Sequence, residues 1–167
     1  MQIIFLPKWA LILSFFIVWP LLQLVITLIC NMIDLNKFNP NIFFLKSHNW
    51  EKGGAIYKTV FKIHRWKHLL PDGAKTHKTG FQKKNIKNFK KEYLNEFIYQ
   101  TGRAEIAHWI QIMPFFVFGF WSPNFVIWIM LLYAILVNMP CIIAQRYNRP
   151  RLIKIYERKK TKKEVEN

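Results

Sequence analysis

The chain has 167 residues, of which 52% are hydrophobic and 17% aromatic, yet it carries 25 Lys and Arg against 9 Asp and Glu, for a formal net charge of +16. A soluble nucleic-acid-binding domain can carry this charge, but it would not also have a mean hydropathy above zero. Disorder of the whole chain is excluded because it requires low hydrophobicity beside high net charge. The length suits one domain or a small bundle of membrane helices, and we predict a single membrane domain over residues 1–167.

The cysteines and histidines do not form a metal-binding pattern. Cys30 and Cys141 each lie inside an apolar run with no second cysteine nearby, which indicates free buried thiols. His64 and His68 share one face of a predicted helix, but no third ligand follows at the spacing of a metal site. We therefore predict no metal and no cofactor.

The first charge-free run extends from Trp9 to Ile33 and is long enough to cross a membrane. A bilayer core about 30 Å thick needs about 20 apolar residues in a helix, so we predict a span over residues 9–31. A cleaved signal peptide is the alternative, but the apolar part is too long and the small residues of a cleavage site are missing before Cys30. We expect an uncleaved anchor.

The second charge-free run, from Ile106 to Gln145, is long enough for two spans. Residues 121–124 in its middle have the composition of a turn, which predicts a helical hairpin with spans over residues 104–121 and 125–145. Each of the three spans contains a proline that should kink it, namely Pro20, Pro114 and Pro140. The expected fold is an all-α membrane protein with about three transmembrane helices.

The positive charge is divided between two segments. Residues 34–103 carry 15 Lys and Arg against 5 Asp and Glu, and residues 146–167 carry 9 against 3. Because basic loops stay on the cytoplasmic side of a membrane, we predict that the segment 34–103 and the tail 146–167 are both cytoplasmic. The charge is then a topology signal in a multi-pass protein of the bacterial cell membrane, and nucleic acid is not an expected partner.

The cytoplasmic segment contains two patterns typical of amphipathic helices. The first follows Gly53-Gly54 and ends near Leu70, before a Pro-Asp-Gly turn. The apolar stripe of the second consists of Ile86, Phe89, Tyr93 and Phe97, beside a row of lysines. Such helices can lie in the lipid headgroup layer. A solvated basic face, or one that binds the phosphates of an acyl carrier, fits the pattern equally well.

Polar residues stand where the second predicted span begins. Glu105 and His108 are three residues apart and share one helix face, and Arg103 precedes them near the cytoplasmic boundary. A carboxylate at bilayer depth costs about 2.5–3.5 kcal/mol, so such residues normally line a cavity and have a partner. We predict Glu105 and His108 as catalytic residues, in which the carboxylate orients the imidazole and the imidazole accepts a proton from a hydroxyl. The alternative is an ion pair of Glu105 with Arg103 or Arg146 that only joins helices.

The end of the third predicted span carries a second polar group. Asn138 and Gln145 are predicted to face inward beside a slot for a lipid chain, and Arg146 and Arg149, with Asn148 between them, suit recognition of phosphate or carboxylate. We predict these five residues, together with Arg103, as substrate-binding. Anchoring of the arginines to anionic lipids is the alternative.

Three sequence blocks carry a resemblance to a known family. They are Trp66-Lys67-His68 with Asp72-Gly73, Thr101-Gly102-Arg103-Ala104-Glu105-Ile106-Ala107-His108-Trp109, and Gln145-Arg146-Tyr147-Asn148-Arg149-Pro150-Arg151-Leu152. In this order and spacing the chain closely resembles the glycosyl-4,4'-diaponeurosporenoate acyltransferases of Gram-positive bacteria. The resemblance covers nearly the whole chain and adds Lys67, His68 and Asp72 to the expected substrate-binding residues.

The resemblance implies a membrane enzyme of a staphyloxanthin-type carotenoid pathway, which esterifies the C6'' hydroxyl of the glucose on a glycosylated C30 carotenoid with a fatty acyl group. The expected partners are membrane lipid, this glycolipid and an acyl thioester such as acyl-CoA. We expect the thioester to dock its phosphates on Arg103, Arg146 and Arg149, while His108 deprotonates the sugar hydroxyl for direct attack. The alternatives are an acyltransferase for another glycolipid and a non-enzymatic scaffold that binds other enzymes of the pathway.

Overall fold

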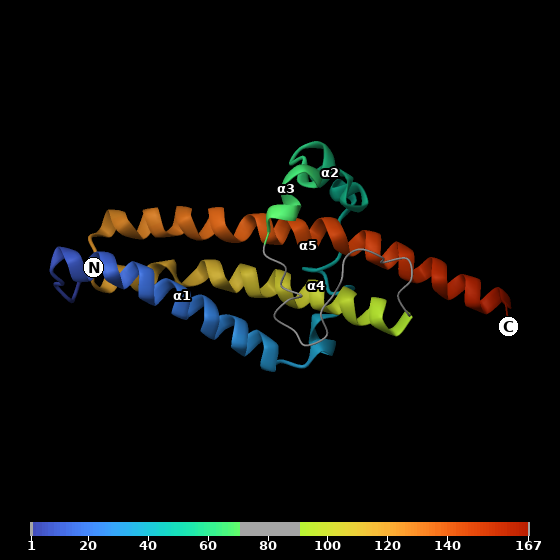
Figure 1. Ribbon diagram of the computed structural model, residues 1–167, viewed down its shortest axis with the longest axis horizontal. Coiled ribbons are helices and arrows are strands. Elements are labelled where there is room, and N and C mark those ends of the chain that lie inside the picture. The colour runs from blue at the N-terminus through green and yellow to red at the C-terminus, as the bar shows by residue number, and fades with distance from the viewer. Residues whose placement is uncertain (1, 71–90, 167) are drawn as a thin grey trace. The chain divides into compact units, whose positions relative to one another are not determined.

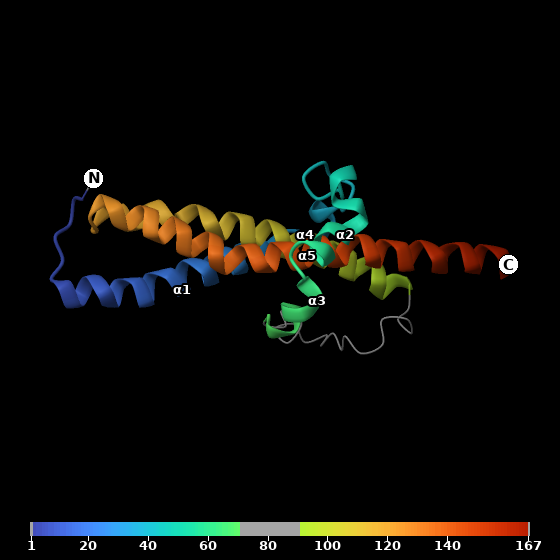
Figure 2. The same cartoon turned by 90° about the horizontal axis from the view of Figure 1, so that it is seen from above.

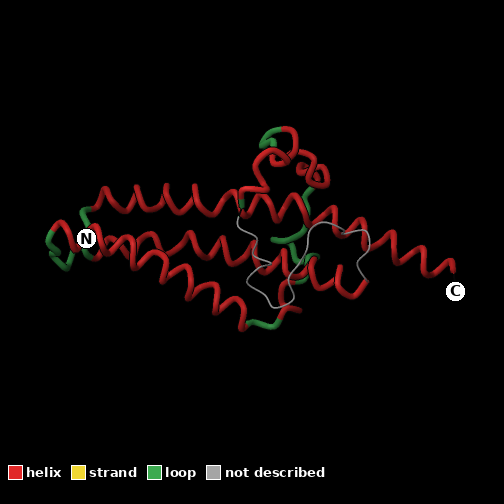
Figure 3. Tube along the Cα trace, viewed as in Figure 1, coloured by secondary structure: helices red, strands yellow, loops and turns green. Residues whose placement is uncertain are grey.

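The computed structural model describes residues 2–70 and 91–166, and every regular element in these ranges is a helix (Figures 1 and 3). The long helices are α1 (Lys8–Met32), α4 (Lys91–Ile112) and α5 (Asn124–Glu166). The short elements are the 3-10 helices η1 (Leu35–Phe38), η2 (Asn49–Gly54), η3 (Lys67–Leu69) and η6 (Met113–Phe120), and the α-helices α2 (Ala55–Thr59) and α3 (Ile63–Trp66). The predicted all-α class is confirmed.

The chain divides into two compact units. Unit 1 comprises Met1–Lys37 and Arg103–Ile142, and unit 2 comprises Phe38–Gly102 and Ile143–Asn167. Each unit has its own buried apolar side chains. The helices α4 and α5 contribute residues to both units.

In unit 1, α1 lies antiparallel to the arm formed by the end of α4 and by η6 (Figures 1 and 2). Three contacts follow this pairing from one end to the other. The Ile3 amide donates to the Phe120 carbonyl at 2.7 Å, the Trp121 indole to the Ser14 hydroxyl at 2.9 Å, and the Arg103 guanidinium to the Asn31 side chain at 3.2 Å. The first half of α5 closes a three-armed bundle whose apolar core includes Trp19, Phe118 and Ala134.

Two helices are long and apolar enough to cross a membrane: α1, and the Asn124–Thr161 part of α5. These correspond to the predicted spans 9–31 and 125–145. The predicted span over residues 104–121 is not a third such helix, because α4 ends at Ile112 and the chain continues as the 3-10 helix η6. Pro114 has no backbone N–H to donate to an α-helical bond, which favours a change of helix type at this point. The described residues therefore contain two helices that are candidate spans, fewer than the about three that we predicted.

Unit 2 is built around the second half of α5. Tyr57 and Ile63, from α2 and α3, pack with Ile143 and Tyr147 of α5. One turn further along, Leu152 packs with Leu94 and Ile98 of α4, and each of these three side chains is at most 3% exposed. The helix α5 therefore supplies one face to the short helices and another to α4.

Two glycines allow close approach of the backbone in unit 2. Gly54 has φ +90°, and a Cβ there would lie 3.2 Å from the Tyr147 carbonyl of α5. At Gly102 a Cβ would lie 2.8 Å from the Phe38 carbonyl and 3.0 Å from the Leu45 side chain. A larger residue at either position would push the chain away from its neighbour.

The first predicted amphipathic helix is interrupted. Lys62, with φ +46°, separates α2 from α3, and the backbone cannot continue a right-handed helix through this conformation. Only the end of the second amphipathic pattern, including Tyr93 and Phe97, falls within α4 as described. Its beginning, the predicted Pro-Asp-Gly turn and the predicted binding residue Asp72 lie outside the described residues.

Candidate functional site

The predicted catalytic histidine lies in unit 1, where α4 faces α5. His108 Nδ1 is 2.9 Å from Asn138 Oδ1, and Asn138 is 1% exposed. The amide nitrogen of Asn138 donates to the Ala134 carbonyl at 2.9 Å, and a carbonyl can only accept. Asn138 Oδ1 is therefore the acceptor and His108 Nδ1 the donor, so neutral His108 has an unprotonated Nε2.

We predicted that the Glu105 carboxylate orients the His108 imidazole, but the side chain hydrogen-bonded to His108 Nδ1 is that of Asn138. Glu105 lies one turn before His108 on α4 and is fully buried. The sequence predicted both Asn138 and His108 as site residues but not their pairing. Since the two residues are thirty positions apart on different helices, their pairing depends on how α4 and α5 pack.

More polar contacts lie between α1 and α4 in the same unit. The Gln111 side chain donates to the Thr27 hydroxyl at 2.9 Å and to the Gln23 carbonyl at 3.1 Å, and Gln23 donates back to the Gln111 carbonyl at 3.1 Å. Arg103 donates to Asn31 as described above. Unit 1 therefore contains a polar layer within an otherwise apolar bundle, and His108 lies on the same helix as this layer.

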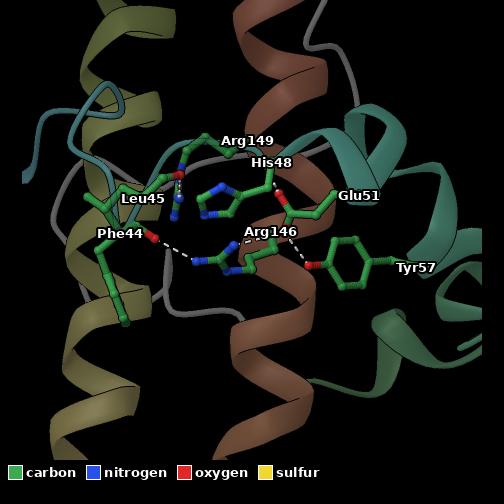
Figure 4. A network of polar contacts seen from close by, with 7 residues as sticks. All are labelled: Phe44, Leu45, His48, Glu51, Tyr57, Arg146 and Arg149. Atoms are coloured by element: carbon green, nitrogen blue, oxygen red, sulfur yellow. Dashed lines mark hydrogen bonds and ion pairs between the residues drawn. The ribbon is translucent and has the colours of Figure 1, made fainter.

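The predicted binding residue Arg146 belongs to a polar network in unit 2 (Figure 4). Its guanidinium forms an ion pair of 2.8 Å with Glu51 Oε1 and donates to the Phe44 carbonyl at 2.6 Å. The Glu51 carboxylate also accepts a hydrogen bond from the Tyr57 hydroxyl and one of 2.7 Å from the His48 backbone amide. Glu51 is 1% exposed, so this is a buried ion pair with several supporting hydrogen bonds.

The electrostatics of this network favour an ionised Glu51. Burial alone would raise its pKa, but the hydrogen bonds from Tyr57, Arg146 and the His48 backbone, with the charge of Arg146, together outweigh burial. The pKa of Glu51 is therefore held below its ordinary value. Burial and the adjacent carboxylate raise the pKa of Tyr57, so its hydroxyl remains a donor.

Arg149 uses its guanidinium within unit 2. Nε donates to the Thr101 hydroxyl at 3.0 Å, Nη2 to the Thr101 carbonyl at 3.0 Å, and Nη1 to the Leu45 carbonyl at 2.7 Å. The side chain is buried. These contacts join the loop that contains Leu45 to α4 and α5.

A small cavity of about 20 Å³ lies beside the two arginines, with Ser47 and Glu51 also in its wall. This volume holds roughly one water molecule. The cavity as it stands therefore has no room for a larger anionic group beside these two arginines.

The other predicted binding residues have varied surroundings. Gln145 and Asn148 are half-buried on α5, and His68 is exposed. The Lys67 ammonium lies 5.2 Å from the centre of the Tyr147 ring, in the geometry of a cation–π contact. Within residues 2–70 and 91–166 no group of three or more His, Cys, Asp or Glu side chains could hold a metal ion.

Comparison with known proteins connects this arrangement to a family. The family model described as glycosyl-4,4'-diaponeurosporenoate acyltransferase matches residues 39–158. The glycosyl-4,4'-diaponeurosporenoate acyltransferase of Staphylococcus haemolyticus (strain JCSC1435) is 32% identical over 139 residues, which cover 83% of this chain and 81% of the relative. That of Staphylococcus aureus (strain USA300) is 34% identical over 137 residues, 82% of each chain.

The chain belongs to this family and is an acyltransferase. The resemblance stated from the sequence is thereby confirmed. No solved structure gives a significant match. All of the predicted site residues of the acyltransferase fall inside the range that the family model matches, whereas α1 precedes it.

Sequence reasoning missed Glu51 and Tyr57 of the acyltransferase. One signal was available for the first of them, because Glu51 is the only acidic residue between Asp34 and Asp72 in a strongly basic segment. A single carboxylate in such a basic segment is expected to form an ion pair. Its partner Arg146 is 95 positions away and could not be identified without the fold.

Proposed function

We propose that this acyltransferase moves a fatty acyl group from an acyl thioester to a sugar hydroxyl of a glycosylated C30 carotenoid, the C6'' hydroxyl of its glucose. The relatives' names support the acceptor, since they state a glycosyl diaponeurosporenoate. The observation that supports the chemistry is the hydrogen bond between His108 and Asn138, because it leaves His108 Nε2 unprotonated and able to act as a base.

The proposed reaction needs no acyl-enzyme. His108 Nε2 takes the proton of the sugar hydroxyl while the hydroxyl oxygen attacks the thioester carbonyl. The tetrahedral intermediate then collapses, the C–S bond breaks, and the imidazolium returns the proton to the departing thiolate.

The proposed setting is the bacterial cell membrane. The helix α1 and the apolar part of α5 cross it, and the arm of α4 and η6 lies between them in unit 1 as a third crossing. The basic segment 34–103 and the tail 146–167 lie on the cytoplasmic side, where acyl thioesters are made. The charge distribution supports this orientation, since basic segments are retained on that side.

Replacement of His108 by Ala tests the proposal. Lipids extracted from cells that express the wild type, His108→Ala or no enzyme are compared by mass spectrometry. We expect His108→Ala to lose the acylated glycolipid while the protein remains in the membrane fraction. His64→Ala, which removes an exposed histidine of α3, is the matched control and should retain the product.

The same comparison separates the alternatives. If the ester that depends on His108 is formed on a different glycolipid, the proposed acceptor is wrong but the proposed role of His108 as the base stands. Normal ester formation by His108→Ala would contradict the assignment of the base. An unchanged lipid profile in cells without the protein would contradict an enzymatic role and favour the scaffold.

A further inference from the structure

Unit 2 exposes large apolar side chains in a segment that cannot cross a membrane. Phe43 is 81% exposed, Leu69 75% and Trp50 58%, and Val60 and Phe61 are exposed as well. The helices of this segment, α2 and α3, have five and four residues. A surface with so many exposed apolar side chains normally contacts a partner or a lipid.

The aromatic side chains are held in place by the buried network. The Trp50 ring lies 6.3 Å from the Tyr57 ring, and the Phe61 ring lies 6.1 Å from Tyr57 on α2. Tyr57 is itself buried and donates to Glu51, which is paired with Arg146. Trp50 and Phe61 are therefore presented by a fixed aromatic cluster and not by a free loop.

The charge around this cluster has one sign. Lys52, Lys58 and Lys62 are exposed, and each lies within three residues of Trp50 or Phe61 in the sequence. The only acidic residue between Asp34 and Asp72 is Glu51, whose carboxylate is buried in its ion pair. Within the described residues 38–70, the surface thus combines exposed aromatic rings with exposed lysines.

Two of these lysines have an unusual backbone. Lys52 has φ +49° and Lys62 has φ +46°, and these are the only non-glycine residues with positive φ in the described ranges. The left-handed conformation is unfavourable for a residue with a Cβ, and glycine or asparagine adopts it more easily. Lysine is therefore an unfavourable choice for the backbone at both positions.

We propose that this aromatic–basic surface, formed by Trp50, Phe61, Lys52, Lys58 and Lys62, docks on the anionic headgroup layer of the bilayer. The rings enter the boundary between headgroups and acyl chains, and the ammonium groups contact lipid phosphates. A membrane is the partner that fits, because the chain carries two helices able to cross one and the surface matches anionic lipid in charge. This property is independent of the proposed acyl transfer.

The test uses the full chain in nanodiscs, with a spin label at position 50. The label is attached to Trp50→Cys in a Cys30→Ala, Cys141→Ala background, and its collision rates with oxygen and with a water-soluble nickel chelate are measured. In discs that contain phosphatidylglycerol we expect a high ratio of the collision rate with oxygen to that with the nickel chelate for the label at position 50. In discs of phosphatidylcholine alone this ratio should be lower, and added salt should lower it in anionic discs as well.

Two sets of variants make the result specific. Lys52→Gly and Lys62→Gly remove charge while relieving the backbone, so folding is preserved, and each should weaken docking about 5-fold. Lys154→Gln removes an exposed charge on α5 and should leave the ratio at position 50 unchanged. A label at Lys154→Cys gives the reference for a water-exposed site. Equal accessibility of positions 50 and 154 to the nickel chelate in anionic discs would overturn the proposal, as would insensitivity of position 50 to both glycine variants.

Discussion

Asn138 holds the ring of His108 through a hydrogen bond of 2.9 Å, and the Ala134 carbonyl fixes the direction of that bond by accepting from the Asn138 amide. Asn138 is therefore a positioning residue for the proposed base. It selects the tautomer in which Nε2 can accept a proton, as an asparagine does beside the histidine of some cysteine proteases.

Replacement of Asn138 by Leu should slow the reaction without weakening substrate binding. The side chain keeps a similar volume but no longer accepts from His108 Nδ1, so the ring can rotate or change tautomer. We expect kcat to fall about 100-fold or more, with KM nearly unchanged, in assays with purified enzyme. Asn138→Asp keeps an acceptor and should retain more activity than Asn138→Leu.

A double variant shows whether Asn138 acts through His108. In a His108→Ala background, Asn138→Leu should cause no further loss of kcat, because the residue that it orients is gone. Independent, multiplicative losses would mean that Asn138 has a role of its own and would contradict this assignment.

Removal of one partner of the buried pair should destabilise unit 2 strongly. Glu51→Gln leaves the Arg146 guanidinium without its counter-ion, and the loss for such a pair is about 3–5 kcal/mol. Chemical unfolding in detergent micelles measures it. Glu157→Gln, an exposed glutamate on α5, is the control and should change stability by less than about 0.5 kcal/mol. A Glu51→Gln, Arg146→Gln double variant should be more stable than additivity predicts.

The contribution of Glu51 to stability should vanish in acid. The pKa of Glu51 is lowered in the folded protein, so its stabilising effect is fully present above about pH 4.3, the pKa of an unperturbed glutamate. It is lost as the pH falls through the lower pKa of the folded state. We expect the difference in unfolding free energy between wild type and Glu51→Gln to be constant from neutral pH to about pH 5 and to shrink below it. A difference that disappears above pH 5 would contradict this account.

A substitution of Arg149 shows whether this arginine binds the acyl donor or stabilises the fold. Its three nitrogens donate to Thr101 and to the Leu45 carbonyl, and lysine cannot reproduce this fork. We expect Arg149→Lys to lower the unfolding free energy by about 2–3 kcal/mol and to leave KM for the acyl thioester unchanged. A raised KM at unchanged stability would instead support the predicted role in binding the donor.

Gly102 should not tolerate a methyl group. In Gly102→Ala the new Cβ would lie 2.8 Å from the Phe38 carbonyl, so the loop or the helix must move, at a loss of about 1–3 kcal/mol. Gly53→Asn is the control, since no atom lies within 4 Å of a Cβ at that position and Asn adopts its φ of +61° readily. Thermal unfolding of the two variants in the same detergent compares them directly.

The parts of the fold that depend on local patterns were predictable. The limits predicted for the first helix, residues 9–31, are one residue inside those of α1, because a charge-free run has visible ends. The predicted turn at residues 121–124 leads into α5, whose first residue is the last of that turn, Asn124, since Ser-Pro-Asn has strong turn chemistry. In contrast, nothing in the sequence indicates a left-handed conformation at Lys62, where lysine is an unusual choice.

The partners of the predicted site residues were much less predictable. The sequence predicts Arg146 and Arg149 as binding residues, but their acceptors include the carbonyls of Phe44 and Leu45, and any residue can supply a carbonyl. A side-chain pattern contains no information about such contacts. Long-range pairs, such as Arg146 with Glu51, depend on which helices become neighbours after folding.

The change of helix type at Met113 also alters the reach of the arm in unit 1. A 3-10 helix rises about 2.0 Å per residue and an α-helix about 1.5 Å, so the stretch from Ala104 to Phe120 is about 30 Å long instead of about 26 Å. The hydrocarbon core of a bilayer is about 30 Å thick. In the membrane setting that we propose, the arm would match that thickness with fewer residues than an α-helix needs, and a substitution that restores α-helical geometry here would shorten the arm and create hydrophobic mismatch.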